Sequence, residues 1–518
     1  MPELRFGGGI NQLSDDLVNF DECVDGENFL LDSDSREFKR RKSFDLKGTA
    51  PNAKSISGIM QLIKRDNTET TLVQANETVY LWDGSSTFTS KATVTTDSLL
   101  RSSYWSLDEV LVITDINKTT VVKQWNGTAI ATLTHAISGV TNLYAKYSVV
   151  FQNRVWLFNV TTDATALPHV ILASAFENYN SFNNAWNPNT TSLTASLPFY
   201  LTTPDLKAIN GVATFFNTIL VSTVDGKIFH LNGTDARDYS IKEFYGGSCA
   251  AGTELMANIG NDVMFCRPGG HVERLMSTQD YGDTKADDVS KYIQLETAAI
   301  TTGITVYDRT NQRIYFFTNN TVLVIDKYIM EAAQISPWMK WTTGMASNLD
   351  VAAATWLRRP GATTYSVYFG GPNGQIYDIN GAVLGDNGST LINAYRKSKL
   401  ISELDTMNDF VQGRISYRRK GAFTGQLTFE WTDEYVDSVS RVPFKTTITS
   451  QGTYFYGSQE LPSYFGGAFY WSAGGITESR ISTVGFDAVG KGPSFFLTLT
   501  CNTTVDFLIH KIEVPEGT

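Results

Sequence analysis

The sequence predicts an all-β protein whose largest part is a β-propeller of six to eight blades. Short apolar and aromatic segments alternate with polar residues along most of the chain, and long stretches with a helical period are missing. β-branched and aromatic residues are enriched in these segments, as they are in strands. Asn-Gly, Asp-Gly or weaker turn signals follow several of them, near residues 83, 126, 232, 266–270, 319 and 380. Several of the intervals lie around 40 to 60 residues, the length of a four-stranded blade with its loops.

Residues 1–50 are expected to form an extended N-terminal arm. They lack the recurring strand and turn pattern, and an acidic stretch is followed by a basic one. The first 30 residues contain no uninterrupted apolar run of the kind that a secretory signal needs. We therefore expect no secretory signal. The arm is expected to form a platform between subunits together with the C-terminal domain.

Residues 51–392 are expected to form the propeller with long loop insertions. The recurring unit is an apolar strand ending in an aromatic residue or Leu, then a turn and a second strand. The clearest turns are Asp83-Gly84, Asn126-Gly127, Asn232-Gly233 and Asn380-Gly381. We expect two-residue type I′ turns, because Asn, Asp and Gly adopt the positive φ that such turns require. Residues 176–205 read as a long loop, and a stack of β-sandwiches is the architecture that the pattern leaves open.

Residues 393–518 are expected to form a separate β-sandwich, which would serve as a platform beside the propeller. The composition changes at 393–420, where basic residues cluster. Segments 425–431, 494–500 and 505–514 then read as strands, because apolar and β-branched residues dominate them.

The charge balance argues against a protein that binds nucleic acid by neutralising its phosphates. Lys and Arg number 42 and Asp and Glu 53, so the formal net charge is −11. Proteins that bind by neutralising phosphates are usually basic. No apolar run approaches the ~18 residues of a membrane helix. The four cysteines fit no zinc or redox motif, so we expect free thiols in a protein made in a reducing cytoplasm.

Nothing in the sequence indicates catalysis, so we expect no enzyme and no catalytic, metal or cofactor residues. The five histidines are far apart, and no nucleophile elbow or phosphate-binding loop occurs. Glycosidases need two carboxylates held across a sugar. The adjacent pairs Asp287-Asp288 and Asp433-Glu434 do not suit this, because neighbours on a strand point to opposite faces.

The arm carries a family resemblance. It begins with a Gly-rich segment that leads into Ile10-Asn11, continues through Asn28-Phe29, and ends in a basic run. In this order the segment resembles the start of the tail nozzle proteins of short-tailed bacteriophages, also called packaged-DNA stabilisation or tail tube B proteins. One departure is that Ser43-Phe44 follows the basic run where a glycine is common in the family.

The resemblance implies a structural virion protein made in the host cytoplasm and built into the viral tail. Six copies would form a ring that extends the channel of the portal and its adaptor, the head-to-tail connector. The ring would retain packaged DNA and guide its ejection. Implied partners are the adaptor proteins, tail fibres or a tail needle or spike, and the host envelope at ejection. Double-stranded DNA would pass through the lumen without specific binding, which suits an acidic chain because Lys and Arg supply most non-specific affinity for DNA.

The basic run is the candidate site for subunit or adaptor docking. Lys and Arg donate to carboxylates of a neighbouring protein or to DNA phosphates. A solvated strand or turn is the plain alternative. The residues concerned are Arg36, Lys39, Arg40, Arg41 and Lys42.

Two other functions stay open at this point. A propeller-type tail protein that binds or degrades glycans, such as a glycosidase or depolymerase, is the main alternative. An intracellular propeller scaffold that binds peptides is the other, although the chain lacks the repeated Trp-Asp signature of such scaffolds.

Overall fold

The computed structural model describes residues 8–398 with short gaps, and beyond them the backbone of further strands. The gaps are residues 14–17, 19–20, 32–38, 136, 164, 183–196, 235, 250–253, 278–283, 299, 301, 319–320, 333–334, 344–350, 382–384 and 387–389. The strands described as backbone only are residues 3–4, 401–402, 408–419, 425–433, 444–449, 482–492, 494–503 and 507–513.

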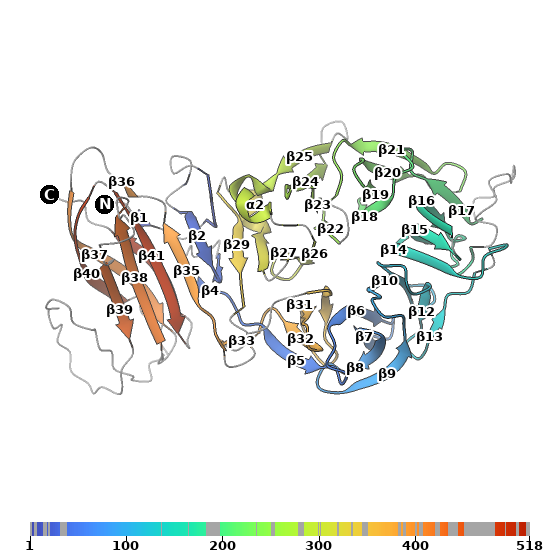
Figure 1. Cartoon of the computed structure of the whole chain (residues 1–518), viewed down its shortest axis with the longest axis horizontal. Coiled ribbons are helices and arrows are strands. Elements are labelled where there is room, and N and C mark those ends of the chain that lie inside the picture. Colours follow the sequence, from blue (N-terminus) through green and yellow to red (C-terminus); the bar gives the residue numbers. More distant parts are fainter. Residues whose placement is uncertain are drawn as a thin grey trace.

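Seven four-stranded antiparallel sheets form a closed ring, so the predicted propeller is confirmed and has seven blades (Figure 1). The innermost strands of neighbouring blades pack against one another all the way round the axis. Six blades are built from consecutive strands. They are β6 (Ile56–Ile63), β7 (Glu69–Ala75), β8 (Thr78–Trp82) and β9 (Phe88–Thr93); β10 (Leu100–Trp105), β11 (Val110–Asp115), β12 (Lys123–Trp125) and β13 (Ile130–Thr132); β14 (Leu143–Phe151), β15 (Arg154–Thr162), β16 (Thr165–Ala173) and β17 (Phe199–Thr202); β18 (Ile209–Phe215), β19 (Thr218–Thr223), β20 (Ile228–Asn232) and β21 (Ser240–Tyr245); β22 (Met256–Asn258), β23 (Val263–Cys266), β24 (Val272–Ser277) and β25 (Thr284–Asp288); and β26 (Ile304–Asp308), β27 (Arg313–Thr318), β28 (Thr321–Asp326) and β29 (Trp338–Trp341).

The seventh blade joins two distant parts of the chain. Strands β30 (Ala354–Arg358), β31 (Tyr365–Gly370) and β32 (Gln375–Asp378) are completed by β5 (Asp45–Thr49). β5 pairs antiparallel with β32, in a register that sets Thr49 opposite Gln375. Residues 45–49 lie within the predicted N-terminal arm, which lacks the recurring strand and turn pattern of the blades. In the structure β5 closes the ring.

A second unit is woven from both ends of the chain. One sheet runs in the order β2 (Cys23–Glu27), β35 (Ala394–Ser398), β41 (Ser494–Thr503), β38 (Gly425–Asp433) and β39 (Phe444–Thr449), with β36 (Ile401–Ser402) also pairing with β41. The other has β1 (Glu3–Leu4), β42 (Phe507–Glu513), β37 (Asn408–Arg419) and β40 (Ser482–Gly492). Two short pairs complete the strands: β3 (Phe29–Leu30) with β4 (Lys39–Arg40), and β33 (Gly385–Asp386) with β34 (Thr390–Leu391).

The N-terminal segment therefore supplies strands to both of these sheets (Figure 1). The sandwich packing expected for residues 393–518 rests on side chains that lie outside the described residues. Helix is confined, within the described part of the chain, to α1 (Gln294–Thr297), α2 (Lys327–Ala332) and the 3-10 turn η2 (Val289–Tyr292). None of the described helices has the length and apolar character to span a bilayer.

Aromatic residues on the blade strands form much of the core between the blades. Trp82, Trp105, Trp125, Trp156, Trp338 and Trp341 are each at most 1% exposed. Buried indole groups need an acceptor for their N–H. Trp156 donates to the Phe151 carbonyl, and Trp341 donates to the Phe29 carbonyl of the N-terminal segment. The aromatic strand residues predicted from the sequence are thus core residues.

The predicted type I′ turns are wrong at all four positions, because none of Asp83, Asn126, Asn232 and Asn380 has a positive φ. β8 and β9 are joined by residues 83–87, where Gly84 has a φ of +89° but Asp83 is not among the residues with positive φ. The Asp83 carboxylate instead accepts from the backbone N–H groups of Ser85 and Thr87, at 2.8 and 3.1 Å. Asn126 caps its turn in the same way. The Asx side chain, rather than paired positive φ angles, shapes these turns.

Candidate binding site on the propeller axis

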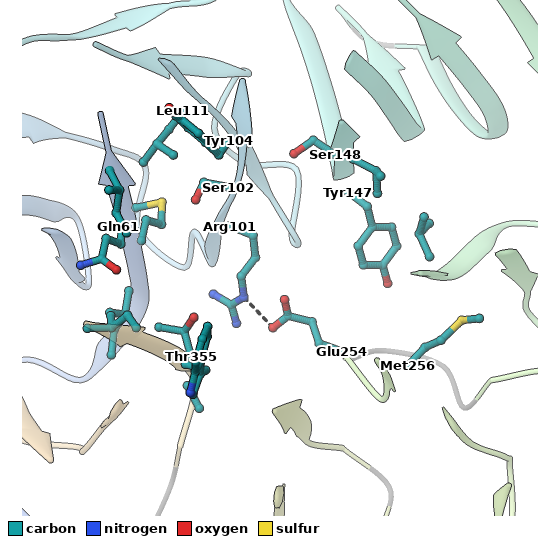
Figure 2. Close-up of a pocket in the computed structure, with 18 of the residues that line it drawn as sticks. Gln61, Arg101, Ser102, Tyr104, Leu111, Tyr147, Ser148, Glu254, Met256 and Thr355 are labelled. Carbon is teal, nitrogen blue, oxygen red and sulfur yellow. Dashed lines mark hydrogen bonds and ion pairs between the residues drawn. The ribbon is translucent and has the colours of Figure 1, made fainter. Parts of the chain in front are cut away.

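A cavity of about 810 Å³ lies on the axis of the propeller. Its lining comes from the innermost strands β6, β10, β14, β18, β22 and β30, with Arg309 added directly after β26 (Figure 2). Every blade thus contributes a residue to the cavity. Its volume falls within the ~300–1,000 Å³ typical of small-molecule sites.

An ion pair crosses the axis at the end where the inner strands begin. Arg101 near the start of β10 donates through Nε to Oε2 of Glu254 at 2.5 Å (Figure 2). The same guanidinium donates to the carbonyl oxygens of Ser57, Leu100 and Ala352, each at 2.8 Å. Charge-assisted bonds of this kind are the stronger class of protein hydrogen bonds. Arg101 therefore ties four segments of the ring together and bridges the axis.

Neutral polar groups line the wall between this bridge and the other end. Ser102, Ser148 and Thr355 are half-buried, and Ser103 donates to the Ser148 hydroxyl at 3.0 Å. Tyr147 donates to the Asn210 carbonyl at 2.8 Å, and burial raises the pKa of its phenol well above the ordinary value. Tyr147 is thus a protonated donor that is already bonded.

Gln61 joins the first blade to the last. Its side-chain amide donates to the backbone carbonyl of Arg358 and accepts from the backbone N–H of the same residue. Because both ends of the amide are used, Gln61 acts here as a connection between β6 and β30.

A stack of four side chains stands where the cavity meets the β26–β27 and β30–β31 turns. The rings of Trp356 and Tyr365 stack with centroids 4.3 Å apart. Arg309 lies over Trp356 at 5.5 Å, and Arg358 lies over Tyr365 at 5.7 Å. Such cation–π contacts are worth about 0.5–1 kcal/mol at exposed sites. Arg358 is also ion-paired with Glu69, whereas Arg309 is exposed.

The described lining of the cavity is poor in carboxylates. Glu254 is the one carboxylate among the cavity residues, and it is paired with Arg101. Glycoside hydrolysis uses two carboxyl groups across the sugar. No group of three or more metal-ligating side chains occurs in the described part of the chain. Of the adjacent carboxylates noted in the sequence, Asp288 caps η2 by accepting from Ser290, and Asp433-Glu434 lie outside the described side chains.

The structure separates the five basic residues proposed for docking. Arg36 lies outside the described residues. Lys39 and Arg40 form β4, in which Lys39 is half-buried and Arg40 is buried. Arg41 is buried, and Lys42 is exposed. The run is therefore no single surface patch, because its members point into different surroundings.

Arg41 forms an internal ion pair that the sequence did not predict. Its guanidinium makes a two-point contact with Asp386 at 2.6 and 2.8 Å, and both side chains are fully buried. It also donates to Asn28 Oδ1 and to the Thr342 carbonyl, at 2.8 and 2.7 Å. Its plane lies 3.9 Å over the Phe44 ring. A guanidinium that is occupied on all sides is not available to another protein or to DNA in this conformation.

Three buried cysteines, Cys23, Cys249 and Cys266, are free. Burial raises the pKa of Cys23 to about 11 and that of Cys266 to about 12. Because a raised pKa keeps a thiol protonated, we expect a thiolate fraction of about one in a thousand or less at pH 8, and the thiolate is the reactive form.

Native protein treated with iodoacetamide at pH 8 should therefore remain unmodified at Cys23 and Cys266, whereas unfolding in urea should expose both. Mass spectrometry of the peptides reads each cysteine separately. Modification in the native state as fast as in urea would contradict the burial of these thiols.

The comparisons with known proteins show similarity in fold alone. No family model matches the sequence, and no curated protein matches it. A catalytically inactive variant of virginiamycin B lyase from Staphylococcus aureus, with quinupristin, is 9% identical with a TM-score of 0.42, covering 65% of this chain and 98% of that one. PorZ of the type-IX secretion system of Porphyromonas gingivalis is 10% identical with a TM-score of 0.35, covering 70% and 44%. The β-propeller domain of Cps50 (Swd1) from Myceliophteria thermophila is 12% identical with a TM-score of 0.31, covering 65% and 98%.

Proposed function

We propose that this chain is a structural virion protein, the tail nozzle of a short-tailed bacteriophage. Six copies form a ring that extends the channel of the portal and its adaptor, retains the packaged DNA and guides its ejection. The protein performs no catalysis in this role. The resemblance of the arm to nozzle proteins motivates the proposal.

The observation that carries the proposal is the second unit woven from both chain ends. β5 closes the propeller without help from any other subunit. Yet β2 pairs with β35, and β1 pairs with β42, so the segments before and after the propeller are built into common sheets. A propeller that acts alone does not require such a unit. A subunit of a closed ring does need a second surface, because cyclic assemblies use head-to-tail contacts.

The lumen of this assembly lies between subunits rather than along the propeller axis. The Arg101–Glu254 ion pair crosses that axis, with Nε of Arg101 2.5 Å from Oε2 of Glu254. A DNA duplex, whose major groove alone is about 12 Å wide, does not fit past it. Each subunit brings a formal net charge of −11, and an acidic lumen lets DNA slide because it offers few cations to phosphate.

The proposal places the adaptor proteins, tail fibres or a tail needle or spike, and the host envelope among the partners. Among the described members of the basic run, Lys42 is exposed and suits an acidic partner surface. Arg41 instead holds the N-terminal segment in place through Asn28 and Asp386.

Negative-stain microscopy of the purified chain, alone and mixed with its adaptor, tests the assembly. We expect class averages with six-fold symmetry and an open centre in at least one of the two samples. Isolated single discs in both would contradict the nozzle. A glycan-degrading propeller predicts something different, namely that host polysaccharide releases reducing ends when it is incubated with the protein.

A further inference from the structure

At the mouth of the axial cavity, Arg309 is a cation without a hydrogen-bonding or ionic partner among the described residues. The other two charged residues of the lining, Arg101 and Glu254, neutralise each other. Arg309 contacts the face of Trp356, and its side chain makes no hydrogen bond or ion pair with any residue that the structure describes. The described cavity thus carries one uncompensated positive charge in a chain whose net charge is −11.

The Trp356 ring supports the Arg309 guanidinium at the cavity mouth. The guanidinium lies 5.5 Å from the centroid of this ring, which in turn stacks on Tyr365 with centroids 4.3 Å apart. A cation–π contact of this kind is worth about 0.5–1 kcal/mol at an exposed site. It leaves the N–H groups of Arg309 available to an anionic ligand.

The rest of the wall offers groups that both donate and accept. Ser102 and Ser148 carry hydroxyls, and Tyr104 is a phenol that is 37% exposed. Partial burial raises the pKa of Tyr104, so the phenol keeps its proton as a donor. Hydroxyl groups act as donor and acceptor at once, as the hydroxyls of a sugar do. Ile63, Val149 and Val212 line the cavity, are half-buried, and supply apolar surface for the C–H faces of such a ligand.

We propose that the axial cavity binds a short acidic saccharide whose carboxylate pairs with Arg309. The sugar hydroxyls bond to the serine and tyrosine hydroxyls of the wall. Binding occurs without cleavage, because the one carboxylate of the described lining is held by Arg101. This site is independent of the proposed nozzle role, which needs no ligand in the propeller.

Isothermal titration calorimetry on the full chain tests the site with three acidic probes: trigalacturonate, trimannuronate and sialyllactose. Methyl-esterified trigalacturonate has the same skeleton without charge, and triglutamate carries carboxylates on a peptide. We expect at least one acidic sugar to bind to the unaltered protein. The Arg309→Gln variant should bind that sugar at least about tenfold more weakly, because it loses a charged hydrogen bond. Lys242→Gln removes an exposed positive charge from the outer strand β21 and should leave binding unchanged.

A second variant tests whether the ligand occupies the cavity. Ser148→Phe fills the cavity from β14 and should abolish binding, while an unchanged thermal midpoint would show that the variants are folded. The proposal is overturned if no acidic sugar binds, if Arg309→Gln binds as well as the unaltered protein, or if the methyl ester binds equally. Binding of triglutamate in place of the sugars would assign the cavity to an acidic peptide instead.

Discussion

Replacing Arg41 with methionine is expected to lower the free energy of unfolding by about 3–5 kcal/mol, because it leaves the buried Asp386 carboxylate without its counter-charge. Both partners are fully buried, and their contact is two-pointed at 2.6 and 2.8 Å. The same change removes the donors to Asn28 and Thr342. Urea unfolding followed by tryptophan fluorescence measures the loss.

Two further variants isolate the cause. Lys42→Met changes the exposed neighbour of Arg41 and should alter stability by no more than about 0.5 kcal/mol. The double variant Arg41→Met/Asp386→Asn removes both charges and should be more stable than Arg41→Met alone, since no unpaired buried charge remains. If Arg41→Met costs no more than Lys42→Met, Arg41 is not the internal anchor that its contacts indicate.

The basic run illustrates what sequence alone can and cannot give. Its composition predicts donors for carboxylate or phosphate, and Arg41 does pair with a carboxylate. The partner is 345 positions away in the same chain, however, and nothing near Arg41 in sequence marks Asp386. Local patterns reveal which groups seek a partner, but the fold decides which partner they meet.

The blades show the same difference between what local sequence patterns predict and what the fold decides. Alternation and β-branched residues predicted the strands, and aromatic strand ends predicted buried tryptophans such as Trp82 and Trp125. The blade number stayed between six and eight because the turn signal is incomplete. The blade of β14–β17, for example, has no Asn-Gly or Asp-Gly turn; its first hairpin turns at Gln152 and Asn153, both with positive φ. Glutamine gives no turn signal in a sequence.

The axial cavity could not be predicted at all. Its lining takes one to four residues from each of several distant strands, so no segment of sequence contains a recognisable site. Arg309 looks like an ordinary turn residue until the fold brings Trp356 beneath it. A serine, a tyrosine and an unpaired arginine become a candidate site only through the ring closure that sets the inner strands around one axis.

Closure of the ring is expected to depend on β5. Replacing residues 45–49 with Ser-Gly-Ser-Gly-Ser, which keeps Gly48, should cost at least about 3 kcal/mol, since it adds backbone freedom and removes the packed Leu46 side chain. Leu46 packs against the largest core cluster of the described residues, and a Cβ at Gly48 would lie 2.4 Å from the Ser85 carbonyl of the first blade. β5 is therefore seated against both blades that meet at the closing point.

The matched control is the same five-residue replacement at 51–55, in the turn that follows β5 and is largely exposed. It introduces the same flexibility without touching the β5–β32 pairing, so its cost should be much smaller. Thermal unfolding and size-exclusion chromatography compare the two, and the β5 variant should also associate, because the freed edge of β32 can pair with another chain. Equal stability of the two variants would mean that the ring stays closed without β5. The contacts of β30 and β31 with β6 would then suffice to close the seventh blade onto the first.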